Sequence, residues 1–439
     1  MQRDELNAAL RRFVKDKLTP TQEDRDFVST VYDSIRQLLN DACIQIGSYP
    51  RFTAIRPVHD LDILYLLGPW DWKLHDPAGA LKALYDRIIS TYKNPTKFKF
   101  KVTLQTHSVT ITFTDNGEEI LSVDIVPAYA DGKNEFGQEM YRVPEVLRKK
   151  HGKQRAEFYI SFSQAHREML WIPSDPRGYI EVASRVNQSN PDFRRTVKFV
   201  KAWKNACKEN HEDFPLKSFH LEQVVTGYFQ AHEGMEIFDG IFMFFVNLPE
   251  TIRLPQIKDR ADGNKFIDDY LADLTSDQKK MIIQARDYIL KVFEERKDDD
   301  PIEDLLDGGS YERAGADEQF LFDFNIPTLT DERYAFAIRA KAQVRDGGFK
   351  ERFLDAIGRI DVDRKIEFRT KGNLPKVDLF KWKVKNDDCS PQPRGEISDH
   401  RTRNDPEHTK YIGDHYVECY AILHGTCVWK DRQNVKLGG

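Results

Sequence analysis

The chain contains 439 residues, more than one hydrophobic core usually serves, so we expect two or three domains. Hydrophobic residues make up 40% of the chain and charged residues 31%, which is typical of soluble proteins. We find no continuous apolar run of about 18 residues, the length that a membrane helix needs, and no apolar signal core at the N-terminus. Five scattered cysteines fit a reducing compartment, so we expect a cytoplasmic protein without a membrane partner.

The formal net charge of −5 is unevenly distributed. Residues 341–439 hold 20 Lys and Arg against 16 Asp and Glu, so the remainder of the chain is acidic. This mild basic excess permits an anionic ligand, but it is too small to indicate duplex DNA binding.

The first part of the chain alternates between helical and strand patterns. Helices are expected at residues 3–17, from a Thr21 cap to about Leu39, and from Asp76-Pro77 to about Tyr92. Strands are expected from Asp60 to about Leu67 and at residues 98–105, 108–114 and 120–128, with a hairpin turn at 115–117. This order predicts an α+β fold and excludes a doubly wound sheet.

The second part begins with helices and ends with strands. Residues 131–190 give no clear pattern, and helices are then expected from Asp192 and at 217–232, 240–252 and 276–297. The acidic run before Pro301 predicts a linker. After Pro327 we expect a separate α+β domain, with a helix pair at 332–358 broken at Gly347-Gly348 and strands at 364–369, 378–385, 415–423 and 426–430.

Three aspartates carry the strongest chemical signal. Asp60 and Asp62 lie two residues apart on a predicted strand, so their carboxylates project from the same face. Asp124 lies between Val and Ile in another apolar strand, where a charged residue is unusual unless it faces a site. Three carboxylates on neighbouring strands can hold two Mg²⁺ or Mn²⁺ ions about 4 Å apart, the arrangement for phosphoryl transfer. The Gly47-Ser48 turn would offer a backbone N–H and a hydroxyl to a triphosphate.

The motifs carry a resemblance to a known superfamily. Gly47-Ser48 followed by Asp60-x-Asp62 and a later strand aspartate resembles the polymerase-β-type nucleotidyltransferases. The run Thr53-Ala-Ile-Arg-Pro57 resembles the cGAS/DncV-like nucleotidyltransferases (CD-NTases) of bacterial anti-phage systems. The resemblance covers roughly residues 1–300 and implies a catalytic sheet lobe at 1–190 and a helical lobe at 191–300 that closes the active site.

Two further runs resemble helices of the oligoadenylate synthases. Residues 199–203 (FVKAW) resemble their Leu-Val-Lys-x-Trp helix, and residues 217–222 (KSFHLE) resemble the helix that follows it. By this resemblance Lys201 contacts the donor triphosphate, as a compact charge suited to phosphate, and Ser218 lies beside it. The alternatives are a solvated helix face for Lys201 and a helix cap for Ser218.

The C-terminal part resembles a second module. Residues 383–386, 394–397 and 409–420 resemble the AGS-C domain, named as a predicted sensor fused to such synthases. This implies a linker at 301–327 and a smaller α+β sensor domain at 328–439.

Two groupings of side chains in this module predict ligands. Aromatic and basic residues could form a stacking and phosphate pocket for a nucleotide or RNA, although most such aromatics are core residues: Tyr411, Tyr416, Tyr420, Trp429, Lys385, Arg394, Arg401 and Arg403. The cysteines and histidines leave open a structural zinc site, but their spacing is irregular and lacks C-x-x-C: Cys389, His400, His408, His415, Cys419, His424 and Cys427.

The chain ends in Leu437-Gly438-Gly439, a flexible diglycine that resembles the end of ubiquitin-like modifiers. One hypothesis is conjugation to a partner through Gly439. The alternative is a short disordered tail.

Together these features predict a Mg²⁺-dependent nucleotidyltransferase that releases pyrophosphate from NTPs, with ATP expected among them. Its product would be a cyclic di- or trinucleotide, or a short linear oligonucleotide, acting as a second messenger in anti-phage signalling. Two alternatives stay open: transfer of one nucleotide to a protein or tRNA acceptor, and a catalytically silent nucleotide sensor.

Overall fold

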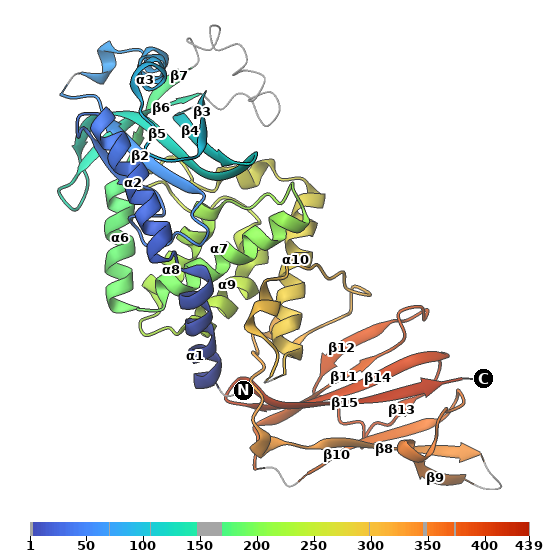
Figure 1. Cartoon of the computed structure of the whole chain (residues 1–439). Helices are drawn as coiled ribbons and strands as arrows, with labels where there is room; N and C mark the ends of the chain where they lie inside the picture. Colours follow the sequence, from blue (N-terminus) through green and yellow to red (C-terminus); the bar gives the residue numbers. More distant parts are fainter. Residues whose placement is uncertain are drawn as a thin grey trace.

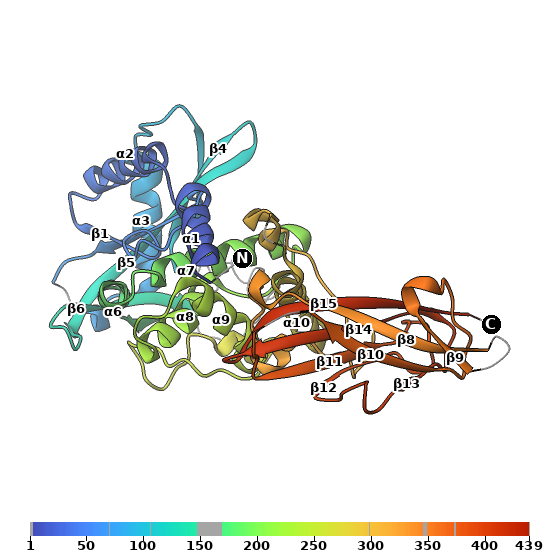
Figure 2. The ribbon, with the colours of Figure 1, turned by 90° about the horizontal axis from the view of Figure 1, so that it is seen from below.

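The computed structural model describes residues 3–69, 71–105, 107–146, 169–297, 299–345, 349–372 and 375–438. Figure 1 shows three parts that follow one another along the chain: a sheet with flanking helices, a group of helices, and two further sheets at the C-terminal end. The helices lie between the first sheet and the C-terminal sheets in both views (Figure 2).

The predicted N-terminal helices are confirmed. α1 (Arg3–Phe13) continues into a π-helical turn (Val14–Leu18), and α2 (Gln22–Leu38) begins at a capping box formed by Thr21 and Asp24. Asp76 caps α3 (Pro77–Thr91), whose first residue is the expected proline.

The first sheet has seven strands in the order β1-β2-β5-β4-β3, and β6 and β7 extend it from β5. The hairpin between β4 and β5 turns at Asn116 and Gly117, both with positive φ, as predicted. β5 runs further than expected, and β6 and β7 lie in the region that gave no clear pattern. The strands are β1 (Cys43–Ile46), β2 (Asp60–Leu66), β3 (Lys99–Leu104), β4 (Val109–Asp115), β5 (Glu118–Lys133), β6 (Glu139–Val146) and β7 (Met169–Ser174).

Five helices form the middle part. Their core contains Trp203, whose ring makes edge contacts with Phe214, Phe244 and Phe245. The predicted helices between residues 192 and 297 are confirmed, and α6 is an addition. The helices are α6 (Pro176–Ser189), α7 (Phe193–Asn210), α8 (Ser218–Ala231), α9 (Ile237–Thr251) and α10 (Ser276–Glu295).

The segment predicted as a linker packs on this helical core. Ile302, Leu305, Phe320 and Phe322 are buried in the same hydrophobic cluster as Trp203. Arg313 joins the segment to α10 through an ion pair with Asp287, in which Nε and Oδ2 are 2.7 Å apart. The short 3-10 helices are Trp72–Leu74, Asp269–Asp273, Ile302–Leu306, Leu321–Phe324, Glu332–Tyr334 and Leu354–Ala356.

The C-terminal part consists of two four-stranded sheets that share one hydrophobic core, ordered β13-β10-β8-β9 and β12-β11-β14-β15. All four predicted strands are confirmed, and β12 and β13 are additions. The strands are β8 (Ala337–Arg345), β9 (Phe349–Phe353), β10 (Lys365–Lys371), β11 (Leu379–Lys385), β12 (Arg394–Ser398), β13 (Glu407–His408), β14 (Gly413–Leu423) and β15 (Thr426–Leu437).

The predicted helix pair at 332–358 is wrong, because this segment forms the antiparallel strands β8 and β9. Its Ala, Lys and Arg residues favour a helix when taken alone. However, Phe336, Ile338, Ala340 and Ala342 are buried, which is the two-residue period of a strand with one face in a core. Sheet pairing therefore overrides the local preference here. For the chain as a whole, the predicted α+β class is confirmed.

A search of the helices in the described residues found none with the length and apolar character that crossing a membrane requires.

Candidate active site

The parallel pairing of β2 and β5 brings the three predicted aspartates together. Asp62 lies directly opposite Asp124 in this register, and Asp60 lies opposite Ser122. The intervening Leu61 and Val123 are fully buried on the other face of the sheet. Asp60 is exposed, and the other two aspartates are half-buried. The sheet therefore presents three carboxylates on one face while its opposite face forms the core.

Gly47 makes close contact with this group. It has a φ of +76°, and a Cβ at this position would lie 1.8 Å from Oδ2 of Asp62. Only glycine allows the turn to approach Asp62 this closely. In the same turn, the carbonyl of Ser48 accepts a hydrogen bond of 3.0 Å from the backbone N–H of Thr53. Gly47 and Ser48, predicted to bind phosphate, therefore lie beside the aspartates. Glycine is also required at position 47 because a larger residue would collide with Asp62.

Two hydroxyl groups orient Asp124, from Thr110 in β4 and from Ser108 just before it, and neither was predicted from the sequence. Thr110 lies opposite Asp124 and its hydroxyl donates to Oδ1, while the Ser108 hydroxyl lies 3.3 Å from the same oxygen. The sequence signal for these hydroxyl groups was the alternation of residues 108–114, which places Ser108, Thr110 and Thr112 on one face of the predicted strand.

Neighbouring carboxylates contribute to a raised pKa at Asp60 and at Asp62. Burial, then the charges of Asp124 and Asp60, raise the pKa of Asp62 to about 6. Although Asp60 keeps an exposed surface, desolvation of its carboxylate by neighbouring protein atoms, and then the charge of Asp124, also raise its pKa. Arg51 and Lys201 act in the opposite direction on Asp62. The site therefore holds more negative charge than its own cations balance.

This donor set fits a hard divalent cation. Carboxylate oxygens are the ligands that Mg²⁺ and Mn²⁺ prefer, and a cation between the aspartates would relieve their repulsion. Within the described residues, no three His, Cys, Asp or Glu side chains already lie close enough to hold a metal ion by themselves. An ion at Asp60, Asp62 and Asp124 would therefore take further ligands from water or from substrate phosphates, as Mg²⁺ commonly does.

Lys201 lies in a buried ion-pair cluster. Its Nζ donates to Oε2 of Glu222 over 2.5 Å and to the Thr53 hydroxyl over 3.2 Å. Arg51 Nε donates to the other Glu222 oxygen over 2.6 Å. These four side chains connect the turn at Gly47-Ser48 with α7 and α8. Contact between Lys201 and a donor triphosphate stays a prediction.

The charges in this cluster are well matched. Burial alone would raise the pKa of Glu222, but Lys201 and Arg51 hold it down at about 2, so its carboxylate is ionised. From the sequence, Glu222 and Thr53 were noted only as members of motifs, and Arg51 was not noted. The sequence signal for Glu222 was its position as an ionisable residue among apolar residues of a predicted helix, where a charge needs a partner.

Ser218 is the first residue of α8 and is half-buried. It precedes Glu222 by four residues, so both side chains lie on the same helix face. The guanidinium of Arg51 lies 5.2 Å from the ring of Phe219, which places the start of α8 beside the active-site turn. A triphosphate contact of Ser218 stays a prediction.

The C-terminal pocket predicted from aromatic and basic residues is assembled only in part. Tyr420 and Trp429 belong to the interior: the Tyr420 hydroxyl bonds Glu418, and the Trp429 indole donates to the carbonyl of Phe336 over 3.0 Å. Lys385 is buried and pairs with Asp388. Tyr411, Tyr416 and Arg394 do meet, in the lining of a cavity between the two C-terminal sheets.

Neither the zinc site nor the free tail is seen in the described part of the chain. Cys419 and Cys427 are buried, Cys389 is exposed, and none of the described cysteines or histidines joins a group that could hold a metal. Leu437 is buried at the end of β15, and the N–H of Gly438 donates to the carbonyl of Ile360. The expected flexibility is therefore wrong for these two residues, and Gly439 lies outside the described residues.

Comparison with known proteins gives one family-model match and one similar curated protein. Residues 317–438 match the AGS_C family model, described as the adenylyl/guanylyl and SMODS C-terminal sensor domain. The chain is also similar to the cyclic AMP-AMP-AMP synthase of Escherichia coli (strain MS 115-1), with 25% identity over 183 residues. That alignment covers 42% of this chain and 48% of the relative, so the chain spans about half the relative's length. Both resemblances drawn from the sequence motifs are confirmed by these matches.

Three solved structures show a more remote likeness. The E. coli MS115-1 CdnC:HORMA-deltaN complex matches 70% of this chain and 98% of its own, with 18% identity and a TM-score of 0.47. The CD-NTase CdnG of Bradyrhizobium diazoefficiens in complex with GTP matches 70% and 96%, with 12% identity and a TM-score of 0.48. The DncV cyclic AMP-GMP synthase of Vibrio cholerae matches 66% and 92%, with 13% identity and a TM-score of 0.46. These likenesses are too remote to support an argument about activity.

Proposed function

We propose that the chain is a Mg²⁺-dependent nucleotidyltransferase that joins ribonucleotides from NTPs and releases pyrophosphate. The observation that carries this proposal is the register of β2 and β5, which sets Asp62 against Asp124 with Asp60 and Gly47 beside them. The similarity to a cyclic AMP-AMP-AMP synthase supports a cyclic product, and a short linear oligonucleotide is the alternative. ATP is the expected substrate, and anti-phage signalling is the proposed role.

The three aspartates would have two roles in the reaction. Asp60, Asp62 and Asp124 would hold the divalent ions, which when bound neutralise triphosphate charge and favour ionisation of the attacking hydroxyl. Asp124 is fixed by Thr110 and Ser108, so its carboxylate is oriented to accept the proton of that hydroxyl.

The turn at Gly47-Ser48 would bind the donor phosphates through backbone N–H and hydroxyl groups. The cluster of Arg51, Thr53, Lys201 and Glu222 holds this turn against α7 and α8 and thereby positions it relative to the aspartates.

The test is incubation of the purified chain with labelled NTPs and Mg²⁺, followed by mass spectrometry of the products. We expect oligonucleotide and pyrophosphate from the wild type and neither from the Asp60→Asn/Asp62→Asn double variant. Asp115→Asn is the matched control, because Asp115 is an exposed aspartate at the end of β4, and it should retain activity. Equal product from the double variant would rule out the proposal.

The same assay separates the two alternative functions. Label that appears on protein or tRNA, without free oligonucleotide, would favour transfer of a single nucleotide to a macromolecule. Tight nucleotide binding without turnover would favour a silent sensor.

A further inference from the structure

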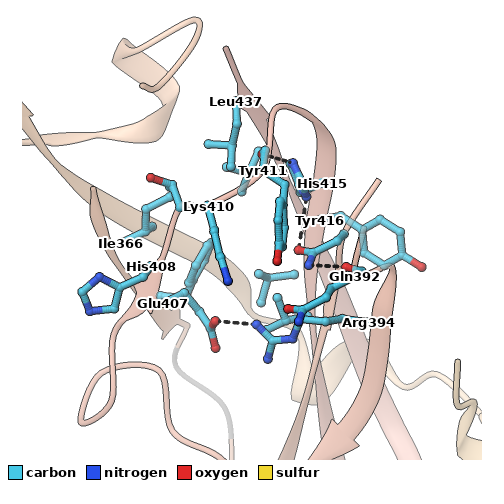
Figure 3. Close-up of a pocket in the computed structure, with 16 residues that line it drawn as sticks. Ile366, Gln392, Arg394, Glu407, His408, Lys410, Tyr411, His415, Tyr416 and Leu437 are labelled. Atoms are coloured by element: carbon cyan, nitrogen blue, oxygen red, sulfur yellow. Dashed lines mark hydrogen bonds and ion pairs between the residues drawn. The ribbon is translucent and has the colours of Figure 1, made fainter. Parts of the chain in front are cut away.

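A cavity opens between the two C-terminal sheets, beside Leu437 at the end of β15 (Figure 3). The cavity has a volume of about 120 Å³, smaller than sites that enclose a whole small molecule, and its mouth is open to solvent. Its floor is apolar and comes from both sheets: Ile366 and Phe368 belong to β10, and Val417 and Val435 belong to β14 and β15. The floor therefore suits a flat, largely apolar group.

The rim of the cavity is polar and carries two cations. Figure 3 shows Lys410, Tyr411, Glu407 and Arg394 converging on its mouth. Arg394 Nη1 lies 2.9 Å from Oε2 of Glu407, which joins the edge strands β12 and β13 across the opening. Lys410 is exposed, and its Nζ lies 5.2 Å from the centre of the Tyr411 ring, so its charge is held at the rim by an aromatic contact that a phosphate can compete with. An anionic group bound at the rim would meet both cations.

The backbone of β12 is shaped to direct Arg394 toward the cavity. Lys383 pairs with Ile397 but Lys385 pairs with Arg394, so β12 carries one extra residue relative to β11. Arg394 has a φ of 51° at this bulge, a conformation that residues other than Gly, Asn and Asp rarely adopt. Bulges of this kind re-aim side chains near functional sites. The strained position therefore points to a role for Arg394 in binding.

The rim is also held in place before any ligand arrives. The buried His415 ring donates from Nε2 to the carbonyl of Tyr411 over 2.8 Å and accepts at Nδ1 from the N–H of Asp387 over 3.2 Å. These two bonds fix the tautomer and tie the loop of Lys410 and Tyr411 to the turn after β11. A preformed rim loses little conformational entropy on binding.

We propose that this cavity binds one nucleoside monophosphate, with the base between the apolar floor and the Tyr411 ring and the phosphate at Arg394 and Lys410. The cavity lies in a different part of the molecule from the aspartates, so the proposal stands independently of the nucleotidyltransferase activity.

The test is isothermal titration of the full chain, without divalent ions, with each of the four ribonucleoside 5′-monophosphates. We expect one site per chain for at least one of them, and weaker binding of the matching nucleoside and of inorganic phosphate. Lys410→Gln and Arg394→Asn should each weaken binding about tenfold, the effect of losing one charged hydrogen bond. Asparagine is chosen because it tolerates the positive φ at position 394.

Lys436→Gln is the matched control, because Lys436 is an exposed lysine of β15 between the inward-facing Val435 and Leu437. This variant and Asp60→Asn/Asp62→Asn should both bind as the wild type does. A 5′-phosphorylated dinucleotide distinguishes two sources of the ligand. If the dinucleotide binds as tightly as the monophosphate, the ligand is the end of an RNA chain. If it binds more weakly, the ligand is a free mononucleotide. Both outcomes support the site.

Three results would overturn the proposal. The first is the absence of monophosphate binding at millimolar concentration. The second is binding that survives Lys410→Gln and Arg394→Asn but is lost in Asp60→Asn/Asp62→Asn, because the ligand would then occupy the aspartate site. The third is equal affinity for the nucleotide and for inorganic phosphate or the nucleoside alone. Unchanged thermal unfolding midpoints show that the variants are folded, and Lys410→Gln, at an exposed residue, keeps the test decisive.

Discussion

The aspartate site and the C-terminal cavity use ion pairs in different ways. In the first, Lys201 and Arg51 share Glu222, whose side chain has no exposed surface. In the second, Arg394 and Glu407 pair at the rim, where their side chains keep 40% and 17% of their exposure. The first set of charges fixes the position of a loop, whereas the second can exchange a partner for a ligand at little cost. Burial therefore distinguishes charges that build a site from charges that receive a ligand.

The largest expected effect tests this distinction through stability. Glu222→Gln leaves Lys201 and Arg51 buried without a carboxylate, and we expect a loss of about 3–5 kcal/mol in the free energy of unfolding. Glu407→Gln breaks a partly exposed pair and should lose no more than about 1 kcal/mol. Urea denaturation of both variants measures the difference. Equal losses would contradict the distinction.

A second test concerns the close contact of Gly47 with Asp62. In Gly47→Ala the added Cβ would overlap Oδ2 of Asp62, so the turn and the carboxylate must move apart. We expect NTP turnover to fall about 100-fold, as for other displacements of about 1 Å at an active site. Gly132→Ala is the control, because Gly132 also has a positive φ, +81°, but its Cβ would meet nothing within 4 Å. Similar activity losses in both variants would attribute the effect to backbone strain alone.

The smallest effect is expected from the hydroxyl groups that orient Asp124. Thr110→Val removes the donor to its carboxylate, and we expect turnover to fall about 10-fold, as when a ligand-orienting hydrogen bond is lost. Thr112→Val is the matched control, because Thr112 is on the same strand face but contacts Ser122 instead. If both variants lose activity equally, the orientation of Asp124 is not the cause.

Local patterns in the sequence were enough to locate the aspartates and most secondary structure. Asp60-x-Asp62 shares a strand face because side chains alternate in every strand, and Asp124 stood out as a charge in an apolar run. Caps such as Thr21 and Asp76 marked helix starts because they satisfy nearby backbone N–H groups. These features depend only on neighbours within a few residues.

Longer-range features were missed or misjudged. The strands β8 and β9 looked helical because Ala, Lys and Arg prefer helices, and only the pairing of β8 with β10 makes their alternation decisive. Tyr420 and Trp429 looked like ligand contacts, yet Tyr420 is buried against Leu321 on the outer face of its sheet and Trp429 packs against the sandwich core. Strand periodicity does not say which face a second element will cover.

The sequence by itself predicted which residues could bind metal and phosphate, and roughly where most of the helices and strands begin. Only the tertiary structure decided that Lys201 and Arg51 meet at Glu222, that Gly47 leaves room for Asp62, and that Arg394 meets Glu407 across a cavity. The physical reason is that periodicity and capping act over a few residues, whereas ion pairs and cavities join segments far apart in the chain.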